Sequence, residues 1–317
     1  MTTISNDIKD FINYCKYERN LSSKTIKAYR IDLKQLDNFF ISNNLPRLSS
    51  HVTKKELKNY LITISKLKPK SIKRKIATIK SMFNYLEFED KIEINPFRKM
   101  RIKIKENNTL PKLMDINEIE KILSCVYSEI KSKGKVRQYA YFESLRNALV
   151  IELLFATGGR VSEIANLRKS NINLVTGLIL ITGKGNKERI TQICNQQTMN
   201  IMREYVKNCN EQFPSKNIFL LINRFGKRLS EQSIRFLVKK LAKKAGINRN
   251  ITPHVFRHTF ATLLLEKDVD IKYIQVFLGH SSILTTQIYT HVNRKKQKQI
   301  LQNKHPRKDL VISHPTI

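Results

Sequence analysis

The first hundred residues place apolar side chains at helical intervals along an otherwise polar stretch. Ser22 or Ser23 is suited to cap a helix, and the apolar residues that follow up to Phe40 recur at broadly helical spacing. Further helices are predicted from about Thr53 and from near Ser71 on the same grounds. The pattern therefore predicts an all-helical first domain.

A break in this pattern separates the first domain from the rest of the chain. Asn95-Pro96 ends the helical region, because the residue before a proline is disfavoured in a helix. We expect a helical domain over residues 1–106, a linker over 107–111 and a second domain over 112–317.

The second domain combines helical patterns with a single hairpin pattern. Apolar and alternating segments on either side of a Gly-Lys-Gly-Asn turn predict one small antiparallel sheet. The expected elements are, in order, a helix at 116–130 capped by Asp115, a polar loop at 132–138, a buried helix at 143–156 that Gly158-Gly159 ends, the hairpin at 178–193, and helices after about Ser230. The chain is therefore predicted to be mainly α with one small sheet.

The charge balance indicates a polyanionic partner. The chain holds 59 Lys and Arg against 26 Asp and Glu, a net charge of +33, with a pI of about 10.1; this composition favours nucleic acid. Residues 1–112 hold 25 basic and 11 acidic side chains and residues 113–317 hold 34 and 15, so both domains are basic. We expect the two domains to clamp DNA, although a basic helix face can also be merely solvated. The candidates for phosphate contact are Lys70, Lys73, Arg74, Lys75, Lys103 and Lys187.

Several classes of protein are excluded by features that the sequence lacks. The four cysteines form no Cys-x-x-Cys pair, so neither a disulfide framework nor a structural zinc site is expected. The N-terminus has no signal-peptide pattern, and no apolar stretch approaches the roughly 20 residues that a bilayer span needs. We expect a soluble, cytoplasmic protein with no membrane segment and no metal site.

Two short motifs carry side chains suited to phosphate chemistry. In ATGGRVSE, Arg160 follows two glycines and Glu163 lies one turn on, where a carboxylate orients the guanidinium or forms a purely structural ion pair. In TPHVFRH, His254 and Arg257 share a face at a helix N-terminus, a position suited to anions. His258, four residues after His254, is more typical of a packing or hydrogen-bonding residue.

Together with a hairpin lysine and a late tyrosine, these side chains suit the attack of a phenol on a phosphodiester. Two arginines would neutralise the charge that develops on the non-bridging oxygens. A tyrosine hydroxyl has an ordinary pKa of about 10, so a positive cluster favours its phenolate. A flexible lysine on a hairpin turn can protonate the leaving 5′ oxygen.

The stretch TPHVFRHTFATLLLEKDVDIKYIQVFLGHSSILTTQIYTHV resembles the signature region of the tyrosine recombinases, the phage-integrase family. ATGGRVSE and GKGNKER are similar to the family's first-arginine and hairpin-lysine motifs, and LSSKTIKAYRIDLKQLDNFF resembles its core-binding domain. LGHSS, QIYTHV and the late His305-Pro306-Arg307 look most like Xer-type recombinases. The resemblance implies a helical, SAM-like core-binding domain and a mixed α/β catalytic domain with a small antiparallel sheet.

The resemblance also implies a role for each matching residue. It assigns Tyr289 as the nucleophile that forms a 3′-phosphotyrosyl link, Arg160 and Arg257 as the clamp on the scissile phosphate, Lys184 as the proton donor to the leaving oxygen, His254 and His280 as assisting groups, and Glu163 as the support of Arg160. Because the link conserves the phosphodiester energy, no metal or nucleotide cofactor is needed.

The expected partners follow from the same resemblance. Family members act as tetramers on two double-stranded DNA recombination sites, pass through a Holliday junction and dock a C-terminal segment on the neighbouring protomer. We expect residues 293–317 to exchange in this way, because Ile300 and Leu301 are too few apolar residues to bury a helix firmly against its own domain. An accessory protein or a partner recombinase fits the same scheme.

Two features depart from the compact Xer pattern: an added loop near Ser132, and Gly159 in place of a larger apolar residue. Chromosomal dimer resolution and the integration or excision of a mobile element therefore both stay open. A type IB topoisomerase uses nearly the same side chains, and a non-catalytic DNA-binding regulator would share the basic charge. The Xer-like tail argues against the first alternative, and the complete set of six catalytic positions argues against the second.

Overall fold

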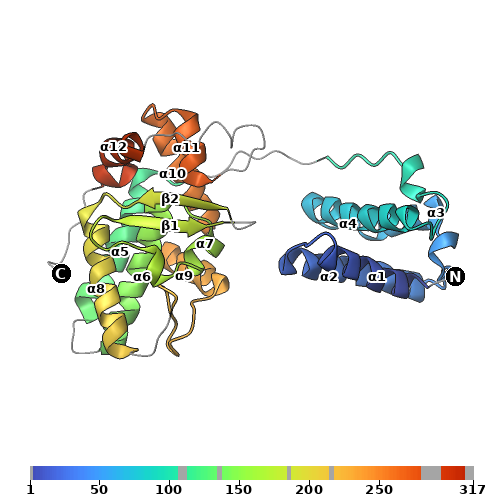
Figure 1. Cartoon of the computed structure of the whole chain (residues 1–317), viewed down its shortest axis with the longest axis horizontal. Helices are drawn as coiled ribbons and strands as arrows, with labels where there is room; N and C mark the ends of the chain where they lie inside the picture. The colour runs from blue at the N-terminus through green and yellow to red at the C-terminus, as the bar shows by residue number, and fades with distance from the viewer. Residues whose placement is uncertain are drawn as a thin grey trace. The chain divides into compact units, whose positions relative to one another are not determined.

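The computed structural model describes residues 3–105, 113–133, 138–183, 187–213, 218–279 and 294–310. The chain divides into two compact units, Met1–Thr109 and Leu110–Ile317. This division falls inside the stretch 107–111, for which the sequence predicts a linker. Figure 1 labels the helices and strands of both units.

The first unit is built from helices. They are α1 (Ile4–Tyr17), α2 (Ser23–Ser42), α3 (Lys54–Thr63) and α4 (Pro69–Phe88), with the 3-10 turns η1 (Ser49–His51) and η2 (Pro96–Lys99). Ser22 caps α2, and Thr53 forms a capping box with Glu56 at the start of α3, as their sequence positions predict. The pattern does not single out α1, and α4 begins slightly before the predicted Ser71.

Helix α4 does not present the whole of the basic face that its sequence predicts. Lys75 is 4% exposed, and its Nζ lies 3.0 Å from the carboxylate of Asp32 in α2. Arg74 also pairs with Asp32, whereas Lys70 and Lys73 are exposed. The prediction of a phosphate contact at Lys75 is wrong, because the fully buried carboxylate of Asp32 requires a buried cation beside it.

The second unit contains the remaining helices and the sheet. Its elements are α5 (Ile116–Lys133), α6 (Gln138–Thr157), α7 (Val161–Ala165), η3 (Lys169–Asn171), β1 (Leu178–Thr182), β2 (Glu188–Gln192), α8 (Gln196–Gln212), α9 (Glu231–Lys244), α10 (Pro253–Glu266), α11 (Ile271–Leu278), α12 (Arg294–Lys304) and η6 (Pro306–Asp309). Strands β1 and β2 pair antiparallel, with Leu178 opposite Gln192 and Thr182 opposite Glu188. The predicted mainly helical class with one small antiparallel sheet is confirmed.

Helix boundaries in this unit differ modestly from their predicted positions. Asp115 accepts a hydrogen bond from the N–H of Glu118 and donates its own N–H to the Glu118 carboxylate, so the predicted cap is confirmed. Helices α5 and α6 both extend into the predicted 132–138 loop, of which residues 134–137 lie outside the described residues.

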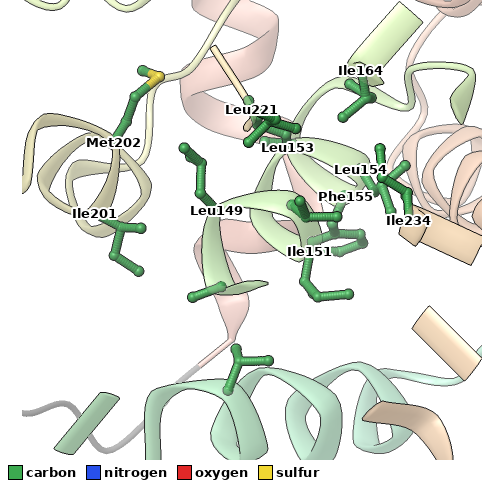
Figure 2. Close-up of a cluster of buried hydrophobic side chains, with 14 of the residues drawn as sticks. Leu149, Ile151, Leu153, Leu154, Phe155, Ile164, Ile201, Met202, Leu221 and Ile234 are labelled. Atoms are coloured by element: carbon green, nitrogen blue, oxygen red, sulfur yellow. The ribbon is translucent and has the colours of Figure 1, made fainter. Parts of the chain in front are cut away.

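Helix α6 forms the centre of the second unit. From Tyr141 to Thr157 all but one of its side chains are buried, which confirms the predicted buried helix. Figure 2 shows its side chains packed among those of neighbouring elements, labelled Leu149, Ile151, Leu153, Leu154, Phe155, Ile164, Ile201, Met202, Leu221 and Ile234. Each such side chain contributes roughly 1.5–3 kcal/mol to the free energy of folding when fully buried. This packing fixes the end of α6, and with it the position at which the following residues begin.

The C-terminal tail, α12 with η6, packs on its own unit. Leu301 of α12 is 2% exposed and joins a buried cluster with Phe260 of α10, while Arg307 of η6 is 1% exposed. The prediction that this tail cannot bury against its own domain is wrong. It counted only apolar residues, whereas a large share of the burial here comes from polar side chains with partners.

No helix in the described part of the chain is long and apolar enough to cross a membrane. All four cysteines are free thiols.

Candidate active site

The first predicted arginine follows a turn that only glycine can form. Helix α6 ends at Thr157, and Gly158 adopts φ +55°, a left-handed conformation that favours glycine. A Cβ at Gly158 would lie 2.5 Å from a ring carbon of Phe260 and 2.9 Å from a methyl of Leu278. The chain therefore reverses tightly against α10 and α11, and Arg160 becomes the first residue before α7.

The second predicted arginine lies one turn into α10. Thr252 caps this helix and Pro253 occupies its first turn, which agrees with the helix N-terminus that the sequence predicts at this motif. Arg257 is 5% exposed and donates one hydrogen bond to the carbonyl of Gly158 (2.9 Å) and another to that of Leu278 (2.8 Å). Its guanidinium therefore connects the end of α6 to the end of α11.

Glu163 holds two guanidinium groups at once. One carboxylate oxygen accepts a hydrogen bond from Arg160 (2.7 Å), and the other accepts one from Arg189 of β2 (2.8 Å). Arg189 also donates to the carbonyl of Phe277 (2.9 Å), and Arg160 donates to that of Gly279 (3.2 Å). Three arginines therefore meet at the C-terminus of α11, where the last carbonyls of a helix lack helical partners and carry partial negative charge.

The cluster keeps a positive charge of 3 − 1 = +2 at neutral pH. Burial works to raise the pKa of Glu163, but the hydrogen bonds and charges of Arg189 and Arg160 outweigh it and hold that pKa below its usual value. Burial, aided by the charge of Arg160, lowers the pKa of Arg257 to about 10, which still leaves it protonated. The cluster is therefore suited to an anion.

Donors are available for that anion. A guanidinium carries five N–H groups. Within the described residues, Arg160 and Arg257 each use two of them in the hydrogen bonds above. Arg160 is 38% exposed, so at least this arginine can be approached from solvent.

The hairpin also borders the cluster. A Cβ built at Gly183 would lie 3.2 Å from Oε1 of Glu163, so the end of β1 approaches the carboxylate closely. Lys187 is exposed, and its carbonyl accepts the N–H of Gly183 (2.7 Å) across the turn. Lys184 lies outside the described residues.

The two histidines of α10 contact each other. The Nε2 atoms of His254 and His258 are 3.0 Å apart, a distance at which one nitrogen donates and the other accepts. His254 is exposed and His258 is half-buried. The pairing agrees with the hydrogen-bonding role that the sequence favours for His258.

The structure brings together Arg160, Glu163 and Arg257, and it adds Arg189, which the sequence analysis did not select. The alternation of β2 offered a signal, because Arg189 shares a strand face with the buried Thr191, and a charged residue on such a face needs a partner. His280 and Tyr289 lie outside the described residues. The described part of the chain contains no group of three His, Cys, Asp or Glu side chains placed to hold a metal ion.

Comparison with known proteins identifies the family of this chain. Residues 112–296 match the Phage integrase family, and residues 8–90 match the phage integrase N-terminal SAM-like domain. The chain is 46% identical to a tyrosine recombinase of Agathobacter rectalis, over 98% of this chain and 99% of that protein. It is 35% identical to the tyrosine recombinase XerD of Halalkalibacterium halodurans, over 97% and 100% respectively.

A solved structure agrees with these sequence matches. The crystal structure of the XerH site-specific recombinase bound to its difH substrate, a pre-cleavage complex, is similar with a TM-score of 0.66 and 25% identity, over 92% of this chain and 83% of that one. These matches give no support to the topoisomerase or regulator alternatives. The chain therefore belongs to the phage integrase family and is a tyrosine recombinase, an enzyme that cuts and rejoins DNA.

Proposed function

We propose that this site-specific recombinase exchanges strands between two copies of a double-stranded DNA site, with the arginine cluster holding the scissile phosphate. The observation that carries the proposal is that Arg160 and Arg257 both bind carbonyls at the end of α11 and keep further N–H donors available. The last of these carbonyls belongs to Gly279, which lies one residue before His280 and ten before Tyr289 in the sequence. XerH, which has a similar fold and is 25% identical, is bound to its DNA substrate in the solved complex.

In the proposed cleavage step, the oxygen of Tyr289 replaces the 5′ oxygen on the scissile phosphorus. The phenolate oxygen of Tyr289 attacks the phosphorus, a 3′-phosphotyrosyl bond forms, and the bond to the 5′ oxygen breaks. Lys184 gives its proton to that oxygen, which leaves as a hydroxyl. Arg160 and Arg257 neutralise the charge that grows on the non-bridging oxygens. The 5′ hydroxyl of the partner strand then returns a proton to Lys184 and attacks the phosphorus of the phosphotyrosyl ester, so the bond to Tyr289 breaks and its phenolate is regenerated.

Supporting residues complete the proposed site. Glu163 fixes the orientation of Arg160 through the 2.7 Å bond, and His254 and His280 assist by hydrogen bonding and proton transfer. The phosphotyrosyl ester retains the energy of the broken phosphodiester, so this scheme contains no nucleotide hydrolysis.

The family resemblance extends the proposal to the assembly. Four protomers would act on two sites through a Holliday junction, and a tail from a neighbouring protomer would occupy the position that the chain's own tail fills here. Among the predicted phosphate contacts, Lys70, Lys73, Lys103 and Lys187 are exposed and remain candidates. Arg74 is occupied by Asp32 and is a weaker one.

A suicide-substrate experiment tests the proposal. The wild-type protein first selects its site from a random pool of duplexes. The selected duplex is then nicked close to the cleavage point, so that cleavage releases a short fragment that carries the 5′ hydroxyl. This fragment diffuses away and the strand cannot be rejoined. We expect a covalent 3′ adduct with wild type and none with Tyr289→Phe, which should bind the duplex normally.

Tyr273→Phe is the matched control, because Tyr273 lies on α11 and is half-buried. It should retain the adduct. An adduct in Tyr289→Phe would assign the nucleophile elsewhere, and relaxation of supercoiled DNA that lacks the site would favour a topoisomerase.

A further inference from the structure

The C-terminal tail contacts both of the helices that position the proposed catalytic arginines, α6 and α10, through the ring of His305. The ring of His305 lies 6.0 Å from that of Phe155 in α6 and 5.5 Å from that of Phe260 in α10, measured between centroids. Phe260 is three residues after Arg257 on the same helix, and Phe155 is five residues before Arg160. His305 therefore lies between the end of α6 and the middle of α10.

Two hydrogen bonds fix the orientation of this ring. The Nε2 of His305 lies 3.0 Å from the carbonyl of Ala156, and its Nδ1 accepts the N–H of Arg307 (3.0 Å). A carbonyl can only accept, so Nε2 carries the proton and the ring is neutral. The carbonyl of Ala156 is among the last four of α6, which have no partner within the helix, so the tail ties down the turn that leads into Gly158.

Arg307 secures the tail to the same helix. It is 1% exposed, and it donates to both carboxylate oxygens of Glu152, at 2.9 Å from Nη2 and 3.1 Å from Nε. Its Nη2 also donates to Gln197 of α8 (2.8 Å). Glu152 is fully buried and lies four residues before Ala156 on α6, so the two tail contacts fall on successive turns of one helix.

We propose that His305 and Arg307 are positioning residues for recombination, which hold the end of α6 against α10 so that Arg160 and Arg257 meet one phosphate together. This proposal rests on the proposed function. The path is short on both sides: Ala156 precedes Gly158, whose carbonyl Arg257 binds, and Phe260 follows Arg257 by one turn.

A comparison of two substrates separates positioning from simple stability. In a methylphosphonate, a methyl group replaces one non-bridging oxygen of the scissile phosphate, so the phosphate is uncharged and its cleavage needs less charge neutralisation. The selected, nicked duplex is prepared with either linkage, and single-turnover adduct formation by the full chain is measured with each.

We expect His305→Phe, which keeps a ring but loses both hydrogen bonds, to slow cleavage of the normal phosphodiester by about tenfold or more, because small misplacement of a catalytic group is costly. Its rate on the methylphosphonate should stay within about threefold of wild type, because that linkage depends less on the arginines. Arg160→Ala should also lose more activity on the phosphodiester than on the methylphosphonate, and the ratio of its two losses calibrates the assay. His305→Gln, which can still donate to the carbonyl of Ala156, should lose less than His305→Phe.

Val126→Ala is the matched stability control, since Val126 is a fully buried residue of α5 that is not among the tail contacts above. It should change both rates by one common factor. If His305→Phe does not fold, Arg307→Lys is measured in the same way, and the same selective loss is expected. Equal loss on both linkages, or no loss on either, would overturn the positioning role while a wild-type adduct leaves the proposed function intact. A wild-type protein that forms no Tyr289 adduct would instead overturn the proposed function.

Discussion

Replacement of Arg307 by Met tests how the tail is held in place. Met has a similar length and no charge, so Arg307→Met keeps much of the packing while it removes the cation that faces Glu152. Tyr127 and Thr198 still donate to the two oxygens of that carboxylate, at 2.6 and 2.8 Å. Both members of the ion pair are buried, 1% and 0% exposed, so the variant leaves a carboxylate without a counterion in the interior.

The magnitude follows from this burial. Breaking a buried ion pair by removal of one partner costs about 3–5 kcal/mol. For a unit of roughly 200 residues, each kcal/mol lowers the melting temperature by about 2–4 °C, so we expect a decrease of about 6–20 °C. The double variant Glu152→Leu with Arg307→Met removes both charges, and should be less destabilised than the sum of its two single variants by about 1–3 kcal/mol.

Calorimetry of the full chain measures this difference, with the N-terminal unit as an internal reference. Arg307 and Glu152 both belong to the unit Leu110–Ile317, so the transition of the other unit should not move. A decrease of less than about 1 kcal/mol in the free energy of unfolding of Arg307→Met would match an exposed ion pair and would refute the reasoning. Strictly additive single variants would likewise refute the reasoning, because they would show that the two charges are not coupled.

Two further predictions concern a buried histidine and the hairpin lysine. Burial lowers the pKa of His305 to about 4, so between pH 6.5 and 4 the unfolded chain binds a proton that the folded chain does not. The free energy of unfolding should therefore fall by about 2 kcal/mol from pH 7 to pH 5. His305→Gln should remove this part of the pH dependence when the free energy of unfolding is measured by denaturation at a series of pH values. Lys184→Ala should slow cleavage of a normal substrate severely but cleave a 5′-thio substrate almost as fast as wild type, because a thiolate leaves without a proton; equal defects on both would reassign the proton donor, with Lys187 the next candidate.

Local chemistry explains which parts of the fold could be predicted from the sequence. Ser22 caps α2 as its position predicts, and Thr53 stands where the sequence predicts the start of α3, because an N-cap depends on residues within one turn of it. Gly158 ends α6 for a reason that is equally local, its left-handed backbone conformation. Arg160 and Arg257 were found because each stands beside such a local signal.

The errors concern residues whose partners are remote in sequence. Lys75 was assigned to the DNA surface, yet it pairs with Asp32, 43 residues earlier. Arg307 belongs to a tail that was expected not to bury firmly against its own domain, yet it pairs with Glu152, 155 residues earlier. Helical periodicity indicates which side of a helix a residue occupies, but it carries no information on the charge that another helix presents there.

Arg189, which the sequence motifs do not include, belongs to a group of three arginines that hold the end of α11. Arg160, Arg189 and Arg257 all donate to main-chain carbonyls at the end of α11, from Phe277 to Gly279. His280 and the proposed nucleophile Tyr289 follow in the next eleven residues of the sequence, so the guanidinium groups proposed to bind the phosphate also hold the residues that precede that segment. Under the proposed function, loss of Arg160 or Arg257 would therefore remove a phosphate ligand and, at the same time, a hydrogen bond that holds the end of α11.

His305 differs from the arginines in this respect. Its hydrogen bonds go to Ala156 and Arg307, and its ring packs between Phe155 and Phe260, so it makes none of the three hydrogen bonds that hold the end of α11. A charge-selective loss in a His305 variant would consequently report the spacing of α6 and α10 and not the release of the nucleophile segment. The arginines combine two proposed functions, binding the phosphate and holding the end of α11. A substitution at His305 separates them, because this residue supports the helices that carry the arginines and makes no hydrogen bond to the end of α11.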